Sequence, residues 1–298
     1  MTLPGGHTPA ASDPKAHARG FALTLFGVLV LTPDTLLIRL IDIDPWTMNL
    51  WRGLLMSVSL AVCYILAARG QAWAGVKALG LAGTAVALIY SINAITFVLA
   101  VDHTRVANVL IILASTPLLA ALLSIIVLKE RVALPTWLAI AGAMTGVAIV
   151  VGDGVRTGTS LGDLLAVVTA IALAVTFIII RRNKHVNMIP ATAVGALISA
   201  MIAMPFAEPL QLEGARLGLM VLLGLVIMPL SFGLITLGPR TIPAPEVALL
   251  LLLETVLGPV WVWLVIDEQP SEMTLVGGAV VISSVMLQSI WRLRRKRN

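Results

Sequence analysis

The chain has 298 residues, of which 59% are hydrophobic and 12% are charged, and its mean hydropathy is +1.00. This composition excludes a soluble globular domain and indicates an integral membrane protein. The net charge of +5 does not indicate a nucleic-acid partner, because the basic residues are spread over loops and a short tail.

Apolar segments follow one another along the chain, each close to the roughly 20 residues that a helix needs to cross a bilayer. Residues 1–18 are expected to be a disordered cytoplasmic N-terminus, and residues 292–298 a basic cytoplasmic tail. The ten expected spans are 20–39, 46–68, 77–101, 106–128, 134–152, 161–180, 189–207, 216–238, 244–266 and 273–291. The predicted fold is an all-α integral membrane domain of ten transmembrane helices.

The basic residues orient these spans. If the N-terminus is cytoplasmic, 15 of the 20 Lys and Arg residues fall on the cytoplasmic side and 4 on the other, with Arg52 inside a span. Because cytoplasmic loops carry an excess of Lys and Arg, both termini are predicted to be cytoplasmic.

An even number of spans divides into two halves of five, expected at residues 19–153 and 154–291. Because five is odd, the second half enters the membrane from the opposite face, as in the inverted repeats of secondary transporters. Residues 106–152 align with 244–290 at an offset of 138, which places Glu130 on Glu268. The sequence therefore predicts two inverted five-helix repeats that alternate access to a central site.

The two ends of this alignment carry a family resemblance. Each half closes with an acidic corner and a Gly-containing helix, the corners being Leu128-Lys129-Glu130 and Ile266-Asp267-Glu268. With Arg52 in LWRGLL, this pattern resembles the EamA group of the drug/metabolite transporter superfamily, although the corner Gly of that family is missing. Span one also departs from the family pattern and has the sequence LTPDTLLIRL. The resemblance implies ten helices, a bacterial cytoplasmic membrane and, in the most similar exporters, amino acid substrates, including aromatic ones.

Two ionisable residues are expected at similar depth in the first two spans. Asp34 lies about 8 Å and Arg52 about 10 Å from the predicted outer ends of their helices, at 1.5 Å per residue. An Asp34–Arg52 ion pair is therefore predicted, and a structural clamp between the helices is favoured over direct substrate contact.

Glu254 is the deepest acid, near the middle of the ninth span. It is a candidate to carry a proton or to bind an ammonium group, and the alternative is a neutral Glu that joins two helices.

Uncharged polar and aromatic residues form a third group of candidates. Tyr90, Asn93 and Phe97 share one helical face by their i, i+3, i+7 spacing. Further candidates on other spans are Asn108, Ser115, Ser231 and Phe232. An aromatic and amide surface suits an amphipathic zwitterion, although Ser, Thr and Asn also join helices in membranes without binding a ligand.

Proline and glycine mark places where helices bend or approach. Pro117 and Pro259 lie on repeat-related spans and are predicted hinges for access switching, unless neighbouring helices absorb the breaks. Gly142 and Gly146 permit close helix approach, expected within the monomer rather than in a dimer.

No enzyme signature is present. His residues are scattered over the N-terminus and opposite loops, and there is no Walker A or dinucleotide fingerprint, so neither a metal nor a cofactor is expected. A channel filter is also not evident. The prediction is a secondary transporter that exports small metabolites, favouring amino acids such as Phe, Trp, Tyr, Met or Thr. A multidrug or nucleoside exporter is the alternative, and uniport and proton antiport both stay open.

Overall fold

The computed structural model describes residues 14–128, 134–208, 212–241 and 244–297, and these residues form helices without a strand. The helices of the first half are α1 (Pro14–Leu31), α2 (Asp34–Ile41), α3 (Pro45–Ala67), α4 (Ala72–Lys77), α5 (Gly80–His103), α6 (Val106–Leu113), α7 (Thr116–Leu128) and α8 (Leu134–Thr157). Those of the second half are α9 (Ser160–Arg182), α10 (Ile189–Ala203), η1 (Met204–Phe206), α11 (Gly214–Val221), η3 (Leu222–Ile227), α12 (Met228–Thr241), α13 (Ala244–Ile266) and α14 (Glu272–Arg297).

Seven helical segments are long and apolar enough to cross a membrane: Ala18–Ile41, Pro45–Ala67, Gly80–His103, Val106–Val127, Ser160–Arg182, Ile189–Phe206 and Gly214–Gly238. Helices α8, α13 and α14 contain the shorter apolar segments Trp137–Asp153, Leu250–Ile266 and Glu272–Ser284. All of these segments fall on expected spans. The all-helical fold is thus confirmed, and the crossing of the membrane by all ten spans stays a prediction.

The contacts between helices are related by exchange of the two halves. Helices at equivalent positions pack on each other in the pairs α3 with α10, α6 with α13 and α8 with α14. The contact of α5 with α9 has its counterpart in that of α12 with α1, and α9 on α6 and α7 corresponds to α1 and α2 on α13. The packing therefore has the pseudo-twofold character expected of a repeat.

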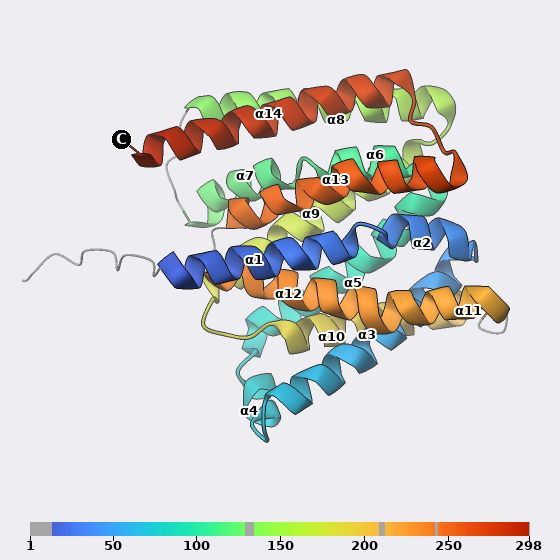
Figure 1. Ribbon diagram of the computed structural model, residues 1–298, viewed down its shortest axis with the longest axis vertical. Helices are drawn as coiled ribbons and strands as arrows, with labels where there is room; N and C mark the ends of the chain where they lie inside the picture. The colour runs from blue at the N-terminus through green and yellow to red at the C-terminus, as the bar shows by residue number, and fades with distance from the viewer. Residues whose placement is uncertain (1–13, 129–133, 209–211, 242–243, 298) are drawn as a thin grey trace, which may run out of the picture.

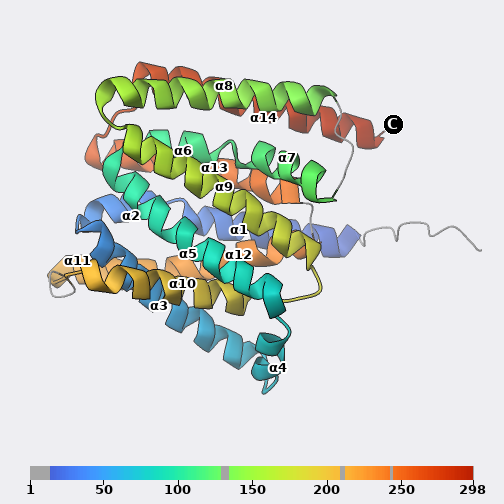
Figure 2. The same ribbon diagram turned by 180° about the vertical axis from the view of Figure 1, so that it is seen from behind.

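The start of α1 and the end of α14 lie at the same end of the helix bundle. Figure 1 shows the start of α1 and the C-terminal end of α14 together, and α2 at the opposite end. We call the first the terminal end and the second the distal end. In both views α8 and α14 lie side by side at one edge, with α3 and α10 toward the other (Figures 1 and 2).

Three of the expected spans are interrupted within their length. The first breaks at Thr32-Pro33, between α1 and α2, because Pro33 cannot donate a helical hydrogen bond. The fourth breaks between α6 and α7, which places Pro117 in the first turn of α7, whereas Pro259 lies within an unbroken α13. In the eighth, the π-helix η3 separates α11 from α12. Repeat-related helices therefore differ in continuity.

Close packing between α8 and α14 depends on glycine. A Cβ atom at Gly146 would lie 2.6 Å from the carbonyl oxygen of Gly277, and one at Gly277 would lie 2.7 Å from that of Gly146. A Cβ at Gly142 would lie 2.3 Å from Oγ of Ser284. The expected approach at Gly142 and Gly146 is thus present within the monomer. The family corner at Glu130 lies outside the described residues.

We predict that Gly146→Ala lowers the stability of the purified protein by about 1–3 kcal/mol, because a methyl group between two backbones forces α8 and α14 apart. The midpoint of thermal unfolding in detergent measures the effect. Gly152→Ala is the matched control on the same helix, since a Cβ there meets nothing within 4 Å. Equal midpoints for the two variants would contradict the packing role of Gly146.

Candidate functional site

A cavity in the described part of the chain lies between the two halves. Its walls come from α1, α2, α3, α5 and α6 of the first half and from α9, α10, α12 and α13 of the second. Helices α8 and α14 contribute none of the lining residues. The cavity therefore lies where the repeats face each other, the place at which repeat-built transporters bind their substrates.

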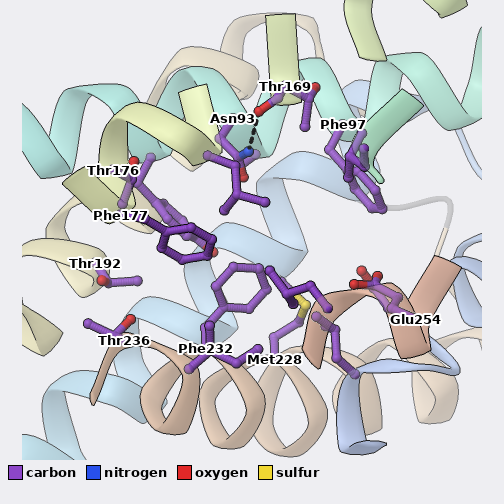
Figure 3. A pocket seen from close by; sticks show the side chains of 18 of the residues that line it. Asn93, Phe97, Thr169, Thr176, Phe177, Thr192, Met228, Phe232, Thr236 and Glu254 are labelled. Atoms are coloured by element: carbon purple, nitrogen blue, oxygen red, sulfur yellow. Dashed lines mark hydrogen bonds between the residues drawn. The ribbon is translucent and has the colours of Figure 1, made fainter. Parts of the chain in front are cut away.

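The cavity has chemically different ends. In Figure 3, Phe97 and Glu254 lie at one end, Thr176, Thr192 and Thr236 at the other, and Phe177 and Phe232 between them. Thr192 follows the start of α10, and Thr236 precedes the end of α12 by five residues. The threonine end of the cavity therefore extends toward the terminal end of the bundle. The charged end, with Phe97 and Glu254, lies farther from the terminal end, and we call it the deep end of the cavity.

The predicted Asp34–Arg52 ion pair is present at the deep end of the cavity. Nη2 of Arg52 donates to Oδ2 of Asp34 at 2.5 Å, and the two side chains are 7% and 2% exposed. The break at Pro33 places Asp34 in the first turn of α2, where the free amide groups and the helix dipole favour a carboxylate. The sequence thus uses a helix break to hold a buried acid.

This ion pair joins only one atom from each group. Nε and Nη1 of Arg52 and Oδ1 of Asp34 have no hydrogen-bond partner, although all three atoms are buried. Nη2 also contacts Sδ of Met228 at 3.1 Å, and the guanidinium lies 5.3 Å from the ring centroid of Phe97. A buried donor or acceptor without a partner is costly, so these atoms are available to form hydrogen bonds with a polar ligand or water.

Glu254 reaches the same cavity from α13. It lies ten residues after Ala244 and twelve before Ile266, and it is 8% exposed. Among the described contacts, its carboxyl group has neither an ion pair nor a hydrogen bond. The deep end thus combines one paired acid, one unpaired acid and one base.

The aromatic wall is built by α5, α9 and α12. The rings of Tyr90 and Phe232 meet edge to face with centroids 5.5 Å apart, and the hydroxyl of Tyr90 donates to Sδ of Met56 at 3.0 Å. Nδ2 of Asn93 donates to the carbonyl oxygen of Thr169 at 3.2 Å, as drawn in Figure 3. These contacts hold the wall in place.

The cavity brings together most of the sequence-predicted site residues, but not all of them. Those that line it are Asp34, Arg52, Tyr90, Asn93, Phe97, Phe232 and Glu254. The hydroxyl of Ser115 donates to Ile112 of its own chain segment, and that of Ser231 to Ile227. Asn108, Ser115 and Ser231 do not line this cavity, and their role in a binding site stays a prediction.

Asn108 belongs instead to a polar cluster at the distal end. Oδ1 of Asp163 accepts from Nδ2 of Asn108 at 3.2 Å and from the hydroxyl of Thr104 at 2.9 Å. Oδ1 of Asn108 accepts from the hydroxyl of Thr274 at 2.6 Å. These bonds join the α5–α6 connection, α6, α9 and α14.

Glu268, at the second-half corner, extends this cluster. One of its oxygens accepts from the backbone N–H of Val106 at 2.8 Å, and the other lies 3.1 Å from Nε of Arg39. Arg39 also donates to the carbonyl oxygen of Thr104 at 2.8 Å. We call Arg39, Thr104, Asn108, Asp163, Glu268 and Thr274 the distal network, because together they tie the distal ends of both halves.

Sequence reasoning missed the contribution of α9 to the cavity. Thr169, Leu173, Thr176, Phe177 and Ile180 line it from α9 and occupy one helical face. Their spacing was visible in the sequence, but the two threonines are indistinguishable there from residues that join helices. Met228 and Thr192 carried no local signal. No group of three His, Cys, Asp or Glu residues among the described ones could hold a metal.

We predict that Asp34→Asn or Arg52→Gln alone lowers stability by about 3–5 kcal/mol, because each leaves a buried charge without its partner. The double variant should lose less than the sum of the two single losses. Thermal unfolding of the four proteins in one detergent measures this coupling. Additive losses would show that the pair does not clamp α2 to α3.

We predict that Asn108→Ala lowers stability by about 1–3 kcal/mol, because Asp163 and Thr274 lose hydrogen-bond partners. It should leave the affinity for a cavity ligand unchanged. Asn93→Ala is the matched variant that lines the cavity and should weaken that affinity. The unfolding midpoint and the dissociation constant of a bound ligand distinguish the two, and the reverse pattern would return Asn108 to the binding site.

Comparison with known proteins supports this architecture. The sequence profile of the EamA-like transporter family matches the chain twice, over residues 18–152 and 160–290. A search of curated proteins gives no significant match. One protein crystal structure superposes with a TM-score of 0.66 at 18% sequence identity, covering 92% of this chain and 98% of its own. At this identity the likeness concerns the fold alone.

The two profile matches fall one on each half, as the helix contacts also divide the chain. The first match ends within α8 and the second within α14. These two helices pack on each other at one edge of the bundle. The chain therefore belongs to the EamA-like transporter family, as a membrane transporter of the drug/metabolite superfamily with one family repeat in each half.

Proposed function

We propose that this protein is a ten-helix secondary transporter that exports amino acids with apolar side chains across the bacterial cytoplasmic membrane. The cavity between the halves is the observation that carries the proposal. Its deep end offers free donors on Arg52 and a free acceptor on Asp34, and aromatic rings line the adjoining space. An α-amino acid has a carboxylate, an ammonium group and a side chain in a matching arrangement.

The shape of the cavity fits the direction of export. It extends toward the terminal end, while the distal network holds α2, α6 and α9 together at the other end. With both termini in the cytoplasm, as the excess of Lys and Arg predicts, this conformation faces the compartment from which an exporter collects its substrate.

The two halves can exchange their packing, and this exchange alternates access to the cavity. Because each half has five expected spans, the second is inserted in the opposite sense, and the pseudo-twofold contacts allow two equivalent packings. Access to the cavity then changes when contacts at the distal end are exchanged for the related contacts at the terminal end. The break between α6 and α7 beside Pro117 is a place where the first half can bend.

We expect purified protein in proteoliposomes to catalyse counterflow of labelled L-phenylalanine, saturably and with competition by Trp, Tyr and Met. A panel with Thr, uridine and a lipophilic cation tests the nucleoside and multidrug alternatives. Exchange of either alternative compound without exchange of any amino acid would overturn the proposed substrate class. Unitary current steps across a planar bilayer would instead identify a channel.

The variant Phe177→Ala should weaken the apparent affinity for phenylalanine by about tenfold or more, because the ring packs beside the substrate side chain. Phe26→Ala is the matched control, since Phe26 is 53% exposed on α1 and does not line the cavity. Equal effects of the two substitutions on the concentration for half-maximal counterflow would remove phenylalanine from this cavity.

A further inference from the structure

We propose that Glu254 couples export to proton entry by binding alternately a proton and the ammonium group of the substrate. The proposal rests on the proposed function, because it assigns a role in the same cavity. It makes the protein an antiporter that exchanges one proton for one amino acid.

The first step is the charge balance of the cavity. Among the described residues that line it, the charged ones are Asp34, Arg52 and Glu254, and Tyr90 is the other titratable group. Arg52 is balanced by Asp34 in a direct ion pair. The carboxyl group of Glu254 is therefore one acid in excess of the available base.

The second step concerns the groups around Glu254. Helix α13 packs against α1, α2, α6, α7, α9 and α12. From these helices only Asp34, on α2, adds a charged group to the cavity lining, and Asp163 of α9 is held in the distal network. The hydroxyl of Tyr90, from α5, is directed to Met56. The described surroundings therefore supply no second cation for Glu254.

The third step is the cost of an unbalanced charge. An ionised carboxylate in an apolar site without a counter-charge is strongly disfavoured. In the empty cavity Glu254 accordingly holds a proton, and the cavity has no net charge. When a zwitterionic amino acid enters, its ammonium group pairs with the carboxylate of Glu254 and its own carboxylate meets the free donors of Arg52, so each charged group has a partner.

The exchange is balanced in atoms and charge over a full cycle, and the loaded cavity carries one net negative charge with every charged group paired. Substrate binding releases the proton of Glu254 toward the side from which the substrate came, and the carboxylate pairs with the ammonium group. After the substrate leaves on the opposite side, Glu254 takes a proton from there and the cavity returns neutral. Each cycle moves a zwitterion outward and one proton inward, so it transfers one positive charge into the cell.

The position of Glu254 suits this exchange. It lies at the deep end of the cavity with Phe97, near the middle of α13 (Figure 3). At this depth a group can exchange with either side when access alternates. Asp34 lies at the same end but is held by Arg52, so it is less free to change partners.

The proposal predicts proton release on substrate binding. When L-phenylalanine is added to the detergent-solubilised wild-type protein in weak buffer, a pH dye should report up to one proton per bound ligand. Glu254→Gln should bind phenylalanine more weakly by calorimetry, because the ammonium group has lost its partner, and the bound fraction should release no proton. Glu272→Gln is the matched control on an exposed glutamate and should behave as the wild type.

Ligand analogues test the same point without a variant. Phenethylamine has the ammonium group and should release a proton, whereas 3-phenylpropionate lacks it and should bind without release. If Glu254→Gln fails to fold, Glu254→Asp takes its place in the test. This variant keeps a carboxyl group and should still release a proton. Binding of phenylalanine to the wild type without proton release would overturn the proposal.

Transport separates this proposal from the function on which it rests. An inside-acid pH gradient should drive concentrative phenylalanine uptake into proteoliposomes with the wild type or with Glu272→Gln, and not into those with Glu254→Gln, whose counterflow is also reduced because the ammonium group has lost its partner. Counterflow without gradient-driven uptake in the wild type would leave an amino acid uniporter and remove the coupling. Failure of counterflow for every compound in the panel would instead remove the proposed function.

Discussion

The buried ion pair between Asp34 and Arg52 is the constraint on which the site depends. It requires a break at Pro33 to place a carboxylate at the start of α2, and it requires α3 to bring a guanidinium to the same depth. Met228 and Phe97 then pack on the guanidinium from α12 and α5. Four helices thus meet at one charge pair, and the aromatic wall is assembled next to it.

The two halves are equivalent in packing but not in detail. Helices α9 and α13 are continuous, whereas the related segments of the first half are broken into α1 and α2 and into α6 and α7. The second half has its own irregularity in the π-helix η3, immediately before Met228. Breaks and π-segments free backbone groups and redirect side chains, and they concentrate at functional sites. Polar chemistry therefore collects where the repeat is least regular.

Sequence patterns predicted what depends on local chemistry and on depth in the membrane. Hydropathy located the helices, and the similar depth of Asp34 and Arg52 on consecutive antiparallel spans was enough to predict their contact. Patterns could not assign the partners of Asn108, because Asp163 and Thr274 reach it from distant parts of the chain. The threonine face of α9 was present in the spacing, but only the placement of α9 against α5 turns that face to the cavity.

The distal network sets an energetic requirement on the proposed cycle. A substrate leaving at the distal end must pass where Arg39 and Glu268 hold the two halves together and Asp163 joins α9 to α6. Each hydrogen bond contributes a net ~1 kcal/mol, so separating the network costs several kcal/mol. Reversing a two-state preference from 1:99 to 99:1 takes about 5.5 kcal/mol, which is of the same order. New contacts at the terminal end must offset this cost, and the bound ligand has to favour them.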